Sequence, residues 1–222
     1  MLQRRCVSLL LALVVAATPQ VVPARVSTEL AKAMELASEG DFAPAYCIWQ
    51  PLAERGNAEA LFNLGWLYRN GNGVAADDGR ARELWQAAAE KGHAEAQMAL
   101  GTLYSMQRDD PENYAQAVRW FRAAASQGVE DALLILLDYA DAGNQQAADA
   151  VAGLVEQRKV GVRVLISVDD GNIRAQPSTK SPVLITLPRN SELLKLDDQG
   201  KWIRVWVPPL RDTGWAFHSL FK

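Results

Sequence analysis

The side chains of this 222-residue chain that could perform acid–base, nucleophilic or metal chemistry are few and scattered. The two histidines, His93 and His218, lie far apart, and no histidine or cysteine cluster has the spacing of metal ligands. No phosphate-binding loop or nucleophile motif occurs. Adjacent aspartates occur beside turns or helix starts, where carboxylates usually cap helices, at Asp77-Asp78, Asp109-Asp110 and Asp169-Asp170. The sequence therefore predicts no catalytic residue, no metal site, no cofactor and no enzymatic activity.

One glycine-rich stretch, residues 71–76, fits the loose pattern of a dinucleotide-binding loop. That pattern needs a strand before it and a helix that opens directly on it. Here an apolar stripe with helical spacing precedes it instead. We interpret Gly71 and Gly73 as a turn with positive φ between two helices, not as a nucleotide site.

The elements that must position any functional side chain follow a repeat of 36 residues. Gly56-Asn57-Ala58-Glu59-Ala60 recurs as Gly92-His93-Ala94-Glu95-Ala96, and loosely from Gly128. A fixed period of this length is typical of a solenoid. Apolar residues recur at helical spacing within each unit, so each unit is predicted to be a pair of helices that buries its apolar face only by stacking on its neighbours.

The expected helices follow from these stripes. They cover Thr28–Ser38, Phe42–Arg55, Ala58–Arg69, Arg80–Glu90, Ala94–Met106, Asn113–Ser126, Glu130–Asp141 and Asn144–Gln157. Small residues such as Gly65 recur where helices must approach closely, and the aromatic residues between pairs are expected to be core. These aromatic residues are Tyr68, Trp85, Tyr104 and Trp120.

The repeat resembles a known family. The matching residues are Leu64-Gly65-Trp66-Leu67-Tyr68, Gly71, Gly73-Val74, Asp77, Ala81, Ala87-Ala88, Lys91-Gly92-His93 and Ala96. They are similar to the Sel-1-like repeat, an α/α solenoid related to tetratricopeptide repeats, and the resemblance runs from about Phe42 to Gly143. It implies an adaptor that binds other proteins, and many bacterial members are secreted or periplasmic. Residues 105–110 replace the glycine loop in the second full unit, so that turn is expected to differ.

The binding surface of a solenoid is usually the concave wall made by its first helices. Asn63, Trp66 and Asn70 lie at positions i, i+3 and i+7 of one such helix, and therefore on one face. Their equivalents in the next unit are different in type, namely Ala99, Thr102 and Met106. We therefore predict that the three form a partner-binding stripe with Trp66 as its anchor. Packing of Trp66 against the preceding helices is the alternative.

The composition changes near Arg158, where short alternating runs separated by turn residues begin. Runs at 162–168, 183–187, 192–196, 202–207 and 214–217 predict a small all-β barrel. In the fourth run, Ile203, Val205 and Val207 share one face and should be core. Trp202, Arg204 and Trp206 share the opposite face.

This part resembles the bacterial SH3 domain. The matching residues include Asn172-Ile173-Arg174-Ala175-x-Pro177-Ser178, Trp202-Ile203-x-Val205 and Thr213-Gly214-Trp215-Ala216-x-His218. The resemblance covers about Val162 to Lys222 and implies binding to cell-wall peptides or other proteins. Three features depart from the family pattern, namely Gly171 in place of an apolar residue, Gln176 in place of glycine, and a hairpin lengthened by residues 208–212.

Within the barrel, Trp202 and Trp215 match family positions and are expected to be structural. Arg174 also matches the motif, and it either contacts a ligand or holds its loop by hydrogen bonds. Trp206 lies opposite the core residues, so we expect it to be an exposed aromatic residue that recognises the ligand.

The N-terminus has the features of a secretory signal peptide. Arg4-Arg5 precedes an apolar run, Cys6–Ala17, and small residues follow, so cleavage is expected after Ala24. The apolar run is about half of the ~20 residues that a spanning helix needs, which makes a retained anchor the weaker alternative. The protein is therefore predicted to be periplasmic or secreted, with no membrane span after cleavage.

Charge is distributed unevenly between the two predicted domains. Residues 25–157 carry 10 basic and 20 acidic side chains, and residues 158–222 carry 11 basic and 6 acidic ones. The net charges are therefore 10 − 20 = −10 and 11 − 6 = +5. The opposite net charges have three possible meanings: the two domains attract each other, binding partners recognise the charge, or the charge has no role.

The expected fold class is multidomain α + β, an α/α solenoid of helix-pair repeats followed by a small all-β SH3-like barrel. The expected domains are a signal peptide (1–24), a Sel-1-like helical domain (25–157) and a bacterial SH3-like domain (158–222). The predicted function is a non-enzymatic exported adaptor in the cell envelope that binds no nucleic acid. The solenoid would bind a protein partner, and the barrel would bind cell-wall peptide or protein. The alternative is a peptidoglycan-targeting module or a regulatory subunit of a wall-remodelling enzyme.

Overall fold

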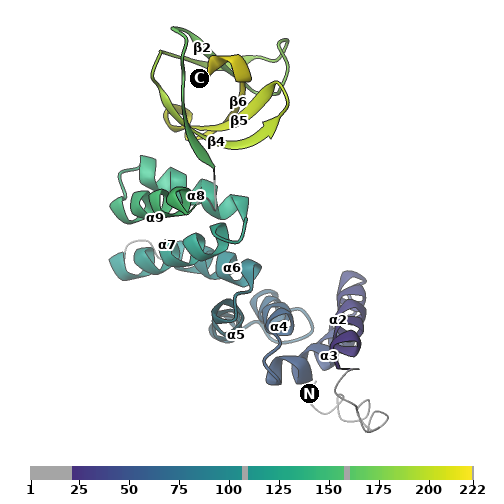
Figure 1. Ribbon diagram of the computed structural model, residues 1–222. Coiled ribbons are helices and arrows are strands. Elements are labelled where there is room, and N and C mark those ends of the chain that lie inside the picture. The colour runs from purple at the N-terminus through teal and green to yellow at the C-terminus, as the bar shows by residue number, and fades with distance from the viewer. Residues whose placement is uncertain (1–21, 107–109, 158–160, 222) are drawn as a thin grey trace. The chain divides into compact units, whose positions relative to one another are not determined.

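The computed structural model describes residues 22–106, 110–157 and 161–221 (Figure 1). Its helices are α2 (Val22–Ser38), α3 (Phe42–Glu54), α4 (Ala58–Asn70), α5 (Asp78–Glu90), α6 (Ala94–Ser105), α7 (Pro111–Ala125), α8 (Glu130–Asp141) and α9 (Gln145–Glu156). The strands follow as β1 (Val162–Leu165), β2 (Gly171–Arg174), β3 (Val183–Leu187), β4 (Glu192–Gln199), β5 (Trp202–Val207) and β6 (Asp212–Phe217). The fold class is thus a helical-repeat region followed by a six-stranded antiparallel β region.

The chain divides into two compact units between Leu100 and Gly101, inside α6. The N-terminal unit holds α2 to α5, and the C-terminal unit holds α7 to α9 together with the barrel. The expected limits of the three domains remain a prediction. Residues 1–21 of the expected signal peptide and residues 107–109 of the expected divergent turn lie outside the described residues. The expected cleavage point after Ala24 falls within α2.

Helix starts and turns are set by local side-chain chemistry. The side chain of Asn57 accepts a hydrogen bond from the backbone N–H of Ala60 at 2.8 Å, and Asp77 caps α5 in the same way. Gly71 ends α4 with φ 69°, and Gly73 follows with φ 72°. Both values are in the left-handed region, which confirms the interpretation of residues 71–76 as a turn between helices.

Close approach between paired helices depends on one glycine in each repeat. A Cβ on Gly65 would lie 2.5 Å from the Trp85 ring, and a Cβ on Gly101 would lie 2.6 Å from the Phe121 ring. Each ring therefore packs directly on the backbone of the first helix. Trp85 and Trp120 are buried, as predicted, whereas Tyr68 and Tyr104 are half-buried.

The strands form one antiparallel sheet in the order β1-β4-β5-β6-β2-β3. Its interior is made by the buried residues Ile166, Ile173, Leu187, Leu193, Ile203, Val205, Val207 and Ala216. The prediction that Ile203, Val205 and Val207 share the core face of β5 is confirmed.

Each departure from the bacterial SH3 pattern has a structural counterpart. A Cβ on Gly171 would lie 2.5 Å from the Ile166 side chain, so Ile166 fills the space of an apolar side chain there. Gln176 does not have a positive φ, so its loop has no need of glycine at this position. The lengthened hairpin forms a short 3₁₀ turn, η2 (Pro208–Leu210), and Arg211 follows it with φ 50°.

Candidate protein-binding surfaces

The solenoid residue with the clearest potential for binding is Trp66, on α4. Its side chain is 42% exposed, although Leu64, Gly65 and Leu67 beside it are buried. The ring of Phe42, the first residue of α3, lies 6.1 Å from the Trp66 ring at a tilt of 45°. Trp66 thus packs on the preceding helix, as one expectation had it. Much of its ring is still open to a partner, as the other expectation, a binding anchor, requires.

The three-residue stripe predicted on α4 is only partly exposed. Asn70 is exposed, and its side-chain amide donates to the carbonyl of Trp66 at 2.8 Å, which steadies the end of the helix. Asn63 is 8% exposed, so the expectation of an open three-residue stripe is corrected. Asn63 lies in the middle of α4, where α3 and α5 pack on either side, whereas Asn70 lies at the helix end. We call Phe42, Trp66 and Asn70 the Trp66 surface.

In the barrel, Arg174 holds its own loop. Its guanidinium Nη1 donates to the carbonyl of Ser181 at 2.6 Å, and the side chain is half-buried. The backbone N–H of Gln176 also donates to Ser181 Oγ, at 2.9 Å. These contacts fit the loop-holding alternative for Arg174, and a ligand contact remains a prediction.

Trp206 is not the exposed aromatic residue that the alternation of β5 predicted. It is 4% exposed, and its indole Nε1 donates to Asp141 Oδ2 on α8 at 2.7 Å. The expectation failed because strand alternation identifies the face opposite the barrel core but not what covers that face. Here a helix of the same unit covers it. Trp202 packs edge-on against Phe217, with 5.1 Å between ring centroids, as expected of a structural residue.

Two ion pairs join the same helix to the barrel. Arg204 Nη2 lies 2.5 Å from Glu130 Oε1, and Arg211 Nε lies 2.6 Å from Asp138 Oδ1. The acidic partners are on the helical side and the basic partners on the barrel side, so part of the opposite charge of the two regions is used for mutual attraction. Sequence reasoning raised this attraction as an alternative but did not assign it to residues.

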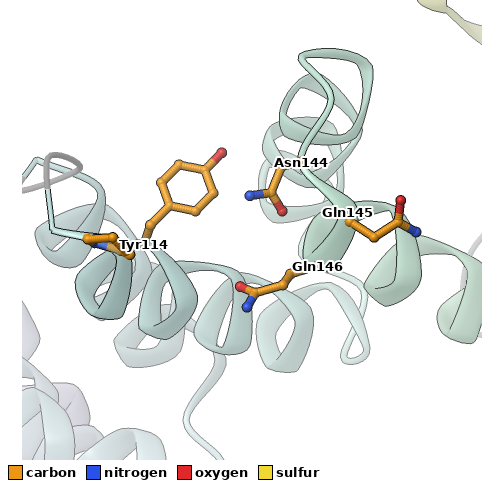
Figure 2. Close-up of a pocket in the computed structure, with 5 residues that line it drawn as sticks. Tyr114, Asn144, Gln145 and Gln146 are labelled. Atoms are coloured by element: carbon orange, nitrogen blue, oxygen red, sulfur yellow. The ribbon is translucent and has the colours of Figure 1, made fainter.

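An open pocket of about 450 Å³ lies in the C-terminal unit, between the starts of α7 and α9. It is lined by Pro111, Tyr114, Asn144, Gln145 and Gln146. Figure 2 shows the Tyr114 ring and the Asn144 amide pointing toward each other across it. The Asn144 side chain accepts from the N–H of Ala147 at 2.7 Å, and Gln145 donates to Asp149. Among these lining residues only Tyr114 is titratable, so the pocket offers little acid–base chemistry.

The two histidines have structural surroundings. His93 stacks on Phe62 at 4.8 Å, and its Nδ1 accepts from the backbone N–H of Ala96 at 3.3 Å. The backbone N–H of His218 donates to the carbonyl of Lys201 at 2.8 Å. Within residues 22–106, 110–157 and 161–221, no three or more His, Cys, Asp or Glu side chains gather closely enough to hold a metal ion.

The largest described pKa shift belongs to Tyr46, on α3. Burial, with help from the 3.2 Å hydrogen bond to Tyr68 of α4, raises the pKa of Tyr46 to about 12. The hydrogen bond between the two hydroxyls joins α3 to α4. In the part of the chain that the structure covers, no helix has the length and apolar character to cross a membrane.

Two protein families match this chain. The Sel1 repeat family matches residues 58–93 and 94–129, and the bacterial SH3 domain family matches residues 169–222. No curated protein matches.

Two similar solved structures are repeat proteins. A Sel1 repeat protein from Oxalobacter formigenes is 28% identical with a TM-score of 0.50, over 63% of this chain and 61% of that one. A protective antigen of uropathogenic Escherichia coli strains, which displays an SLR fold, is 24% identical with a TM-score of 0.48, over 63% of this chain and 32% of that one. This chain therefore spans less than two thirds of either structure.

Proposed function

We propose that this chain, which carries two Sel1 repeats followed by a bacterial SH3 domain, is a non-enzymatic adaptor in the bacterial cell envelope. Both kinds of module are interaction modules, and together they support a protein-binding adaptor. In our proposal, the solenoid binds a protein partner through the Trp66 surface. The barrel binds cell-wall peptide or a wall-associated protein. The leader-like N-terminus supports export to the periplasm or the outside of the cell.

The observation that carries the proposal is the exposure of Trp66. Trp66 is 42% exposed, whereas Leu61, Leu64 and Leu67 of the same helix are buried, so much of its ring is left open to a partner. Tryptophan is enriched among residues that dominate binding energy at protein interfaces. The Phe42 ring packs on the Trp66 ring and restricts its motion. Less side-chain entropy is therefore lost when a partner binds.

The first experiment places a photo-crosslinking amino acid at position 70 of the full chain in cells, beside an intact Trp66. The residue at position 70 should crosslink to a discrete partner, and the Trp66→Ala variant should bind that purified partner at least about tenfold more weakly. Met34→Ala is the matched control, because Met34 is a 45% exposed apolar residue on another helix of the same unit. Equal binding by wild type and Trp66→Ala would exclude the Trp66 surface as the binding site.

The second experiment tests the barrel with purified cell-wall sacculi. The full chain should co-sediment with sacculi at low and at moderate salt if the barrel recognises wall peptide. Pelleting that disappears at moderate salt would indicate charge attraction alone. A crosslinked partner that proves to be a wall enzyme, with activity altered by this chain, would favour the regulatory-subunit alternative. Wall binding that survives deletion of the solenoid would favour the wall-targeting alternative.

A further inference from the structure

We infer that the barrel is locked onto helix α8 by a dedicated docking face, so that the C-terminal unit acts as one rigid block rather than as a tethered module. The docking face consists of Glu130, Asp138 and Asp141 on α8 and Arg204, Trp206 and Arg211 on the barrel. This inference does not depend on the proposed partner of the Trp66 surface.

The centre of the docking face is the Trp206 indole. A hydrogen-bond acceptor stabilises a buried indole N–H, and Asp141 provides a carboxylate at 2.7 Å. A hydrogen bond to a charged acceptor is stronger than one between neutral groups. The large apolar area of the ring is covered at the same time, since Trp206 is 4% exposed. One side chain thus combines burial with a directed polar contact.

The lengthened hairpin supplies the second contact. Residues 208–212 depart from the bacterial SH3 pattern, and η2, within this insertion, packs on α8. Arg211 holds Asp138 at two points, because Nε lies 2.6 Å from the carboxylate and Nη2 donates to the backbone carbonyl at 3.0 Å. Arg211 adopts φ 50°, a value that residues other than glycine seldom take. The insertion therefore has a structural use, which is to direct this guanidinium to α8.

The third contact fixes the orientation of the barrel. Arg204 pairs with Glu130 at the first residue of α8, and Asp141 is its last residue. Single ion pairs on a surface contribute little. Three contacts spread over the whole length of a helix, with a buried tryptophan among them, restrict both sliding and rotation.

The acidic residues are specific to this helix and are not part of the repeat. At a spacing of 36 residues, the equivalents of Glu130, Asp138 and Asp141 on the earlier first helices carry no acidic side chain. These equivalents are Ala58, Trp66 and Arg69 on α4, and Ala94, Thr102 and Ser105 on α6. Among the three first helices, only α8 has acidic residues at these positions, and these residues lie opposite Trp206 and the barrel arginines. We take this match as a sign that this face of α8 binds the barrel specifically. A wall ligand must then bind the barrel away from β5 and η2.

The test uses NMR on the full chain without its leader, with a charge swap between Arg211 and Asp138. In the wild type, the Trp206 indole N–H should be protected from hydrogen exchange, and the barrel should tumble at the rate of α7 to α9. Arg211→Glu or Asp138→Arg alone should lower the indole protection by about tenfold or more and let the barrel tumble faster. The double variant, Arg211→Glu with Asp138→Arg, should restore much of the indole protection and much of the slower tumbling of the barrel.

The matched control is Arg189→Glu, which breaks the 2.8 Å pair of Arg189 with Asp169 in the same barrel but outside the docking face. It should leave the Trp206 indole protected. Protected amides of Ile203 and Val205 in each variant show that the barrel is still folded. A wild-type barrel that tumbles independently, or single variants that leave the Trp206 indole as protected as before, would overturn the inference.

Discussion

Helices α4 and α8 occupy the same place in the first and third units of the 36-residue repeat, yet their outer positions are used differently. At the position where α4 exposes Trp66, α8 has Asp138, which holds Arg211 of the barrel. At the position of Arg69 on α4, α8 has Asp141, which accepts from the Trp206 indole. One helix leaves an aromatic residue open, and the other uses carboxylates to bind a domain of its own chain.

The difference shows that the repeat fixes the scaffold while its outward positions are free to vary. Ala60 and Leu64 of α4 and their equivalents Ala132 and Leu136 of α8 are all buried. A change at an outward position leaves the packing between helix pairs intact, so each helix can present a different surface.

The largest effect is expected from matched truncation of the two tryptophans. Trp206→Ala should lower the free energy of unfolding of the C-terminal unit by about 3 kcal/mol, because it removes a buried ring and leaves a cavity. Trp66→Ala should cost the N-terminal unit about 1 kcal/mol or less, because its ring is already 42% exposed and less apolar burial is lost. Urea titrations that follow amides of each unit would measure both values. Similar losses for the two variants would refute the contrast between a docked and an open tryptophan.

The second prediction compares two glycines within helices. Gly65→Ala should destabilise the N-terminal unit by about 1–3 kcal/mol, because its Cβ would lie 2.5 Å from the Trp85 ring. Gly153→Ala on α9 should stabilise the C-terminal unit by about 0.5–1 kcal/mol, because the nearest atom to its Cβ is 3.8 Å away and alanine favours helix. Thermal unfolding of the two variants would show whether stability falls for Gly65→Ala and rises for Gly153→Ala. A stabilising Gly65→Ala would show that Trp85 can move away.

The third prediction concerns salt. Raising the ionic strength from about 0.05 M to about 0.5 M should increase hydrogen exchange of the Trp206 indole a few-fold, because the pairs of Arg204 and Arg211 are partly exposed and therefore screened. Partner binding through Trp66 should change less, since its surface is mainly aromatic. One salt series should be applied both to hydrogen exchange of the Trp206 indole and to partner binding through Trp66, and the two dependences compared. An indole exchange rate that is independent of salt would assign the docking to apolar burial alone.

The smallest effect is expected at alkaline pH in the N-terminal unit. Because burial and the hydrogen bond to Tyr68 raise the pKa of Tyr46 from 10.0 to about 12, the unfolded chain loses this proton first as pH rises. The stabilising contribution is therefore complete below about pH 10 and is lost between about pH 10 and 12. Tyr46→Phe should flatten this part of the stability profile, measured by urea unfolding at each pH. An unchanged profile would assign the alkaline loss to other groups.

The architecture was predictable because it depends on short-range patterns. The 36-residue period and the helical stripes predicted α8 at its observed bounds and most other helices to within a few residues. α7 starts earlier than expected, because Asp110 caps it and Pro111 is tolerated in the first turn. In the barrel, alternation identified the core face of β5, which needs only the two-residue period of a strand.

The repeat period, the helix pairs, the core face of the barrel and the choice of Trp66 as a candidate residue thus followed from sequence patterns alone. The three-dimensional contacts were needed to show that Asn63 is buried, that Arg174 holds its own loop and that Trp206 faces α8. Periodicity identifies which side of an element points outward, whereas the exposure of that side depends on what packs there from elsewhere in the chain. Trp206 and Asp141 are 65 residues apart, and no local pattern joins a strand residue to a helix end over that separation.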